Sequence, residues 1–172
     1  IDTINILQAS LRAWASVEDD MSKIVSKLNE IVSSNTNGER FITLFLGRYK
    51  EETRELQYVN AGHNAPILIC GDEIKFLKKG TTMIGAFDQL PFINTGIEIL
   101  PPGSLIFNYT DGLVESADED VFISDEELIG YLKKSMFLPV DDLNEKILKN
   151  IKSAFKAEMN SDDITILSIR IL

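Results

Sequence analysis

The spacing of apolar residues along the chain predicts helices at both ends of a run of short strands. In the first 34 residues, apolar side chains recur every three or four positions and so line one face of each of two helices. Helical spacing returns between residues 124 and 155, and the alternating segment 164–172 predicts a final strand. Between them, short β-type runs are separated by turn residues. The predicted strands are 41–49, 56–59, 67–70, 74–77, 93–100 and 105–109.

Polar residues at the ends of these segments predict where elements begin and stop. The run Ser16-Val17-Glu18-Asp19 resembles the start of the second helix, and Ser124 with Glu127 forms a capping box for a third. Pro139 then separates the third helix from a fourth. Tight turns between successive strands favour antiparallel pairing. We therefore predict an α+β fold of stacked antiparallel β-sheets flanked by helices.

Charge and composition exclude several classes of protein. Seventeen basic against twenty-seven acidic residues give a net charge of -10 with no basic stripe, which argues against nucleic-acid binding. No apolar run approaches the ~18 residues of a membrane span, and no signal peptide is visible. The single Cys70 excludes an internal disulfide, and we interpret it as a small buried apolar residue. We expect a cytoplasmic domain without membrane contact.

Two acidic turns are the candidates for chemistry. Asp111, followed by glycine, comes directly after the apolar strand 105–109, and Asp162 and Asp163 come directly before the last strand. Taken singly, each turn is typical of solvated loop carboxylates. If the two strands are antiparallel neighbours, however, both turns lie at one edge of a sheet. Carboxylate oxygens at such an edge are the ligands that magnesium and manganese prefer.

The only histidine, His63, lies in the loop 61–66 between two strands. One histidine with no second Cys or His nearby cannot form a zinc site, and no G-x-S-x-G elbow supplies a nucleophilic serine. Two interpretations stay open, a loop histidine hydrogen-bonded to backbone and a residue facing the substrate. Nucleotide-binding motifs of the P-loop and G-x-G-x-x-G types are also absent from the sequence.

Five segments, in this order, give the chain a family resemblance. They are Leu7-Gln8-Ala9-Ser10-Leu11-Arg12-Ala13, Phe41-Ile42-Thr43-Leu44-Phe45, Tyr58-Val59-Asn60-Ala61-Gly62-His63-Asn64-Ala65-Pro66, Tyr109-Thr110-Asp111-Gly112-Leu113-Val114-Glu115 and Asp162-Asp163-Ile164-Thr165. With them the chain resembles the phosphatase domains of stage II sporulation protein E and the sigma-B regulators. That family is a bacterial branch of the type 2C, metal-dependent protein phosphatases.

The resemblance implies a function and a set of site residues. It implies two manganese or magnesium ions held by aspartates at one edge of the sheets. Asp111 corresponds to the metal aspartate of the family's T-D-G motif and Asp162 to that of its D-D-I-T motif, so both are expected to be catalytic metal ligands. Asp163 is expected beside them as a further ligand or water-positioning group. A metal-activated water would hydrolyse phosphoserine or phosphothreonine on a regulatory partner, such as an anti-anti-sigma factor.

The same resemblance predicts one phosphatase-like domain over residues 1–172 that lacks the family's N-terminal strands and first metal-aspartate turn. Asp2 stands too far along the first helix to replace that aspartate, so weak metal binding is expected. An exposed apolar patch is expected around residues 7–14, where packing partners would be missing. A non-catalytic regulatory module that keeps the fold is the alternative. A generic ligand-binding domain explains the fold but not the motif order, and a homodimer is left open.

Overall fold

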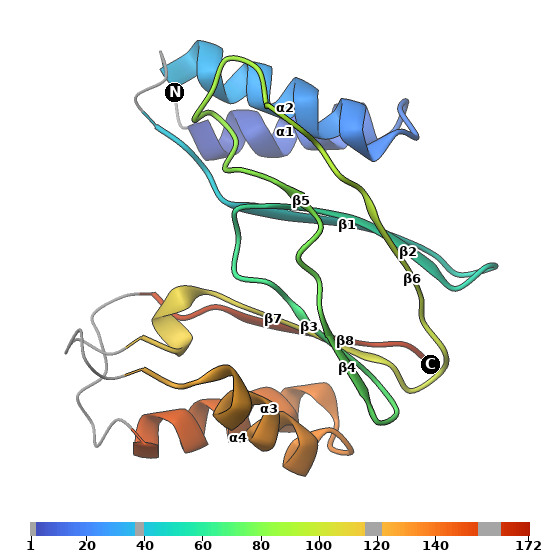
Figure 1. Cartoon of the computed structure of the whole chain (residues 1–172), viewed down its shortest axis with the longest axis vertical. Helices are drawn as coiled ribbons and strands as arrows, with labels where there is room; N and C mark the ends of the chain where they lie inside the picture. Colours follow the sequence, from blue (N-terminus) through green and yellow to red (C-terminus); the bar gives the residue numbers. More distant parts are fainter. Residues whose placement is uncertain (1–2, 37–39, 116–121, 155–162) are drawn as a thin grey trace. The chain divides into compact units, whose positions relative to one another are not determined.

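The structure is a computed structural model that describes residues 3–36, 40–115, 122–154 and 163–172 (Figure 1). It contains four α-helices, one short 3-10 helix and eight strands in these ranges. The helices are α1 (Thr3–Ala15), α2 (Met21–Thr36), η1 (Asp111–Leu113), α3 (Asp125–Ser135) and α4 (Val140–Ala154). The strands are β1 (Leu44–Lys50), β2 (Glu55–Ala61), β3 (Ile67–Cys70), β4 (Glu73–Phe76), β5 (Gly80–Thr81), β6 (Gly96–Ile99), β7 (Leu105–Tyr109) and β8 (Ile166–Arg170).

The chain divides into two compact units, and the first combines Ile1–Ala65 with Leu77–Leu100. Its sheet is built on β2, which pairs with β1 on one side and with β5 and β6 on the other. The β1 and β6 pairings are antiparallel, as the short turns predict. The β5 pairing is parallel and joins Asn60 to Gly80 and Ala61 to Thr81. This short parallel pair is the exception to the favoured antiparallel pairing, because β5 follows β3 and β4 in the chain and is not joined to β2 by a hairpin.

Helices α1 and α2 lie side by side along this sheet (Figure 1). The apolar stripe of α2 is buried against Val59, Ala61 and Ile84. Leu7, Leu11 and Trp14 of α1 pack on the same core but remain half-buried, and no residue of α1 is fully buried. The apolar patch expected around residues 7–14 is therefore largely covered by packing within the unit, and Ile4 is the large apolar residue of this helix that is exposed.

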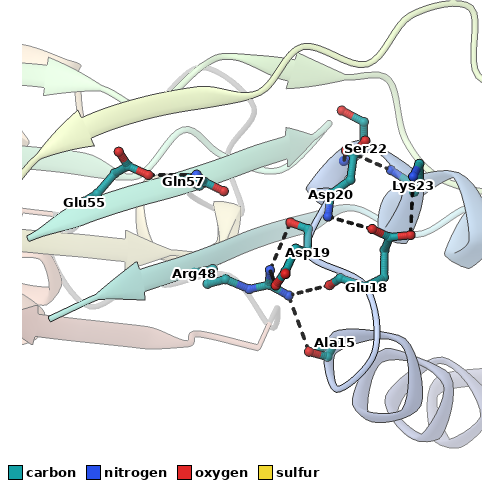
Figure 2. A network of polar contacts seen from close by, with 9 residues as sticks. All are labelled: Ala15, Glu18, Asp19, Asp20, Ser22, Lys23, Arg48, Glu55 and Gln57. Atoms are coloured by element: carbon teal, nitrogen blue, oxygen red, sulfur yellow. Dashed lines mark hydrogen bonds and ion pairs between the residues drawn. The ribbon is translucent and has the colours of Figure 1, made fainter. Parts of the chain in front are cut away.

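The connection between α1 and α2 is held by Arg48 of β1 (Figure 2). Its guanidinium donates to the carbonyl oxygens of Glu18 (2.9 Å) and Asp19 (3.0 Å) and to the Asp19 carboxylate (3.2 Å). The expected helix start at Ser16 is wrong. The Ser16 hydroxyl donates to the carbonyl oxygen of Ala13, so Ser16 follows the last turn of α1 and does not cap α2. The carboxylate of Asp20 accepts from the N–H groups at the start of α2 and is the capping residue.

The second unit combines Pro66–Phe76 with Pro101–Leu172. Its sheet has the order β4-β3-β7-β8 with antiparallel pairing throughout. One face of β3 and β7 packs against α3 and α4 through a continuous apolar core. Helix α3 begins with the predicted capping box, in which the Ser124 hydroxyl accepts from the Glu127 N–H and the Glu127 carboxylate accepts from the Ser124 N–H.

The predicted α+β class is confirmed, with antiparallel pairing dominant in both sheets and helices packed on each. Strands 67–70 and 105–109 have the predicted bounds, whereas the apolar segment 93–100 forms a strand only over Gly96–Ile99. The polar residues 35–38 are typical of a turn, but residues 35 and 36 form the end of α2, and residues 37 and 38 lie outside the described ranges. Among the helices described, none is both long and apolar enough to cross a bilayer.

Candidate metal site

The Asp111 turn follows a strand that is fixed by its packing. Leu105 and Phe107 of β7 are buried in the core beneath α3 and α4. The strand ends at Tyr109, and the chain then forms the short helix η1. Asp111 is exposed at the first position of η1, so the core holds the backbone while the carboxylate reaches solvent.

Local hydrogen bonds hold the Asp111 turn. The backbone N–H of Gly112 donates to Asp111 Oδ1 at 2.9 Å. The Asp111 carbonyl accepts from the N–H groups of Val114 (2.8 Å) and Glu115 (3.0 Å). A carboxylate offers about four lone-pair directions on two oxygens, so one N–H leaves capacity for a cation. The turn thus presents an oriented carboxylate rather than a freely rotating one.

Thr110 joins this turn to the segment just before β8. Its N–H donates to the Thr165 carbonyl (3.1 Å), and its hydroxyl donates to the Asp163 carbonyl (3.1 Å). The same hydroxyl accepts from the Thr165 N–H at 2.9 Å. These contacts continue the β7–β8 register, in which Tyr109 lies opposite Ile166. The prediction that both acidic turns share one sheet edge is confirmed for Asp111 and Asp163.

The carboxylates at this edge are all oxygen donors. Asp163, like Asp111, is exposed, whereas Asp162 lies outside the residues that the structure describes. Within the described ranges, no group of three Asp, Glu, His or Cys side chains is gathered closely enough to hold a metal. The structure therefore brings the two acidic turns together. Their geometry alone does not identify Asp111 or Asp163 as a metal ligand.

Tyr109, the last residue of β7, places an apolar ring directly before the turn. The ring packs against Phe107 with centroids 5.7 Å apart, and the residue is buried. Burial, and secondly the nearby negative charge of Asp125, raise the pKa of the Tyr109 phenol above its ordinary value. The phenol is therefore neutral at physiological pH and adds no charge beside Asp111.

His63 lies in the first unit, in a turn that Asn60 organises. The Asn60 side chain, 6% exposed, accepts from the His63 N–H (2.8 Å) and donates to the His63 carbonyl (2.9 Å). Between them Gly62 adopts φ +70°, a conformation that favours glycine. The half-buried imidazole approaches the Thr43 hydroxyl through Nδ1 at 3.4 Å. These contacts join the His63 backbone to the Asn60 side chain and the imidazole to the Thr43 hydroxyl, so both interpretations of the His63 side chain stay predictions.

Comparison with known proteins decides the family of this chain. The family model described as stage II sporulation protein E (SpoIIE) matches residues 3–172. The chain belongs to the SpoIIE family. It is 21% identical over 151 residues to the phosphoserine phosphatase RsbU of Bacillus subtilis (strain 168), covering 87% of this chain and 44% of that protein. The chain thus spans less than half the length of this relative.

Solved structures show the same fold at low sequence identity. The SiaA-PP2C domain of Pseudomonas aeruginosa matches with a TM-score of 0.81 and 20% identity, covering 98% of this chain and 69% of that one. The catalytic domain of the serine threonine protein phosphatase PstP, in complex with two manganese ions, matches with a TM-score of 0.63 and 15% identity. That match covers 98% of this chain and 80% of the other. The predicted type 2C phosphatase fold is confirmed.

Two residues that organise these SpoIIE-family turns were not singled out as site residues in the sequence. Thr110 and Asn60 each stand at the end of a strand inside a motif, where a polar side chain can bond to neighbouring backbone. Asn60 acts on a residue three positions away, which is a signal that sequence can carry. Thr110 acts on residues more than fifty positions away, and only the β7–β8 pairing reveals that role.

Proposed function

We propose that the chain is a metal-dependent protein phosphatase domain that removes phosphate from phosphoserine or phosphothreonine on a regulatory partner protein. The observation that carries the proposal is the pair of Thr110 hydroxyl bonds, which join the Asp111 turn to the Asp163 segment. Membership of the SpoIIE family supports the reaction class. We propose Asp111 and Asp162 as catalytic metal ligands and Asp163 as a further ligand or water-positioning group.

The residues present suit a hard divalent cation in donor type. Manganese and magnesium prefer carboxylate and water oxygens, and exposed carboxylates of Asp111 and Asp163 stand on the two joined turns. When bound, such ions supply positive charge that activates water and offsets the charge of the phosphate oxygens. The manganese complex of PstP supports two ions as the expected number in a complete site.

The roles of the chain's own residues follow from their bonds. The Gly112 N–H fixes Asp111 Oδ1, so less side-chain freedom is lost when the carboxylate engages a cation. The Thr110 hydroxyl bonds to backbone on the other turn, which keeps both acidic segments in one register. A neutral Tyr109 behind the turn leaves the negative charge concentrated on the aspartates.

Partner, location and domain extent stay proposals. A small phosphorylated regulator, such as an anti-anti-sigma factor, is the substrate class that the family resemblance implies, and the relative RsbU is named a phosphoserine phosphatase. A cytoplasmic location and a homodimer in bacterial signal transduction stay predictions. So does the prediction that further strands and another metal aspartate belong upstream of this chain.

The alternative is a regulatory module that keeps the fold without catalysis. The described ranges contain no cluster of three potential metal ligands, but Asp162 lies outside these ranges, so this finding favours neither function. On this alternative, Asp111 and Asp163 are solvated turn residues that share an edge only because β7 and β8 pair. It predicts partner binding without phosphate release.

The test is manganese-dependent phosphate release from a phosphoserine protein. The 172-residue chain, a version extended upstream, and Asp111→Asn and Asp141→Asn variants of the most active form are compared. We expect Asp111→Asn to lose about a hundredfold or more, since one ligand carboxylate contributes several kcal/mol of charge stabilisation. Asp141→Asn removes the same charge from the exposed first turn of α4 and should change nothing. Absence of activity in every form would contradict the enzyme and favour the module.

A further inference from the structure

A cavity of about 730 Å³ lies in the first unit and involves none of the candidate metal ligands. It is lined by Ser22 at the start of α2, by residues 78–81 around β5 and by residues 92–95 before β6. These three segments are distant in sequence but belong to the same compact unit. The cavity is therefore a feature of this unit's own fold.

The charge of the lining is opposite to that of the protein. Among the described residues that line the cavity, Lys78 and Lys79 are the charged ones, and none of these lining residues carries a carboxylate. The chain as a whole carries a net charge of -10. Two ammonium groups in such a setting attract an anion locally while the rest of the surface repels it. The remaining polar lining consists of hydroxyl and amide side chains, which also bind oxyanions through hydrogen bonds.

The walls of the cavity are tied together by hydrogen bonds. The Asn94 N–H donates to the Gly80 carbonyl (3.0 Å), and the hydroxyls of Ser22 and Thr95 lie 3.2 Å apart. Gly80 packs so closely on β2 that an added Cβ would lie 1.8 Å from the Asn60 carbonyl oxygen. The backbone that carries Lys79 is thus fixed, and a ligand would meet a preformed site.

We propose that this cavity is an oxyanion-binding site that takes a carboxylate or phosphate group carried on a polypeptide side chain. Lys78 and Lys79 supply the charge, and Asn94 and Thr95 supply hydrogen bonds. The volume lies within the range of ligand sites and exceeds what a small inorganic anion fills. Phe92, 54% exposed, and Ile93 add apolar surface for the residues that flank the anion. The proposal is independent of phosphatase activity.

The test is a titration of the isotopically labelled chain, followed by amide NMR in the presence of a chelator that removes divalent ions. Four probes are compared: inorganic phosphate and three peptides that are identical except for glutamate, phosphoserine or serine at one position. We expect the two anionic peptides to shift the amides of Gly80, Thr81, Asn94 and Thr95, with an affinity that falls as salt rises. The serine peptide should leave these amides unchanged.

Variants then separate this cavity from general attraction to lysines. Lys78→Gln with Lys79→Gln should weaken anionic peptide binding about tenfold or more, because two charge-assisted contacts are lost. Lys133→Gln with Lys134→Gln removes an equally exposed lysine pair on α3 and should have no effect. Stronger binding of phosphoserine than of glutamate assigns the site to phosphorylated segments, and equal binding assigns it to acidic ones.

Four results would overturn the proposal. Three of them are equal binding of the serine peptide, equal weakening by the α3 lysine pair, and binding of inorganic phosphate without either anionic peptide. Shifts of the unmodified chain that map only to other amides would also overturn it, and this mapping does not depend on the folding of any variant. A phosphatase that proves inactive leaves these binding outcomes unchanged.

Discussion

Two turns, one in each unit, follow strands in the same way but are held by different interactions. After β2, Asn60 bonds to both the N–H and the carbonyl of His63, only three residues further along the chain. After β7, Thr110 bonds to Asp163 and Thr165, which are more than fifty residues away. The first turn is closed by its own sequence, and the second is closed by the pairing of two strands.

The difference bears on what each turn can do. A turn closed locally keeps its shape as long as its strand is intact, and Asn60 is buried where it does so. A turn closed across strands brings together groups from two distant segments, as a metal site requires. The candidate metal site therefore lies at the turn whose structure depends on the pairing of β7 with β8. Three substitutions test this contrast.

Asn60→Ala should cause the largest loss of stability. The variant removes bonds to both backbone groups of His63 and a third to the Leu77 carbonyl, and it leaves buried polar groups unsatisfied. We expect a loss of about 2–4 kcal/mol in the free energy of unfolding, measured by urea denaturation. Asn64→Ala, in the same loop, is the matched control and should cost less than about 0.5 kcal/mol. Equal losses would show that Asn60 has no special role.

Thr110→Val should lower the stability less than Asn60→Ala does, but it should weaken metal binding. Valine keeps the shape and removes only the hydroxyl, so the bonds to Asp163 and Thr165 are lost. We expect a loss of about 1–2 kcal/mol in unfolding free energy and weaker manganese binding, because the two acidic turns are no longer held together. Thr110→Ser keeps the hydroxyl and should restore both. Normal manganese binding by the valine variant would separate Thr110 from the proposed site.

Tyr109→Phe should have the smallest effect, visible only in alkali. The pKa of Tyr109 in the folded chain is raised above 10.0, the ordinary value expected in the unfolded chain. The contribution of the neutral phenol to the free energy of unfolding is therefore fully present below pH 10. Its contribution is lost as pH rises from there through the folded pKa, by at most about 1.4 kcal/mol per pH unit. Unfolding measured from pH 7 to 11 should show a shallower decline for the phenylalanine variant. Identical slopes would contradict the raised pKa.

Much of the fold follows from local patterns in the sequence. The stripes of α2 and α4, the Ser124 capping box and the buried strand at residues 105–109 are each specified by neighbouring residues. The predicted start of α2 was wrong because two residues that can cap a helix, Ser16 and Asp20, stand four positions apart. Hydrogen bonds of the folded chain show that Asp20 is the residue that caps α2. The parallel β5 pairing has no local signal, since only two residues form it.

The candidate site divides in the same way. The position of Asp111 at a strand end could be predicted from an apolar strand followed by Asp-Gly, and its proximity to Asp163 from the expected pairing of the last strand. The role of Thr110 could not be predicted, because threonine beside a turn is common and its partners lie far away in sequence. The cavity lined by Lys78 and Lys79 also escaped sequence analysis, since it draws on three separate segments.

The most direct test of the central account is manganese binding to the folded chain, followed by electron paramagnetic resonance. Asp111→Asn, Asp162→Asn and Asp163→Asn are compared with Asp141→Asn on α4. The account predicts that Asp111→Asn and Asp162→Asn weaken binding about tenfold or more, with a smaller effect for Asp163→Asn and none for Asp141→Asn. Manganese binding that is equal in all four variants, or that is absent both from the unmodified chain and from the version extended upstream, would contradict a metal site at the joined turns.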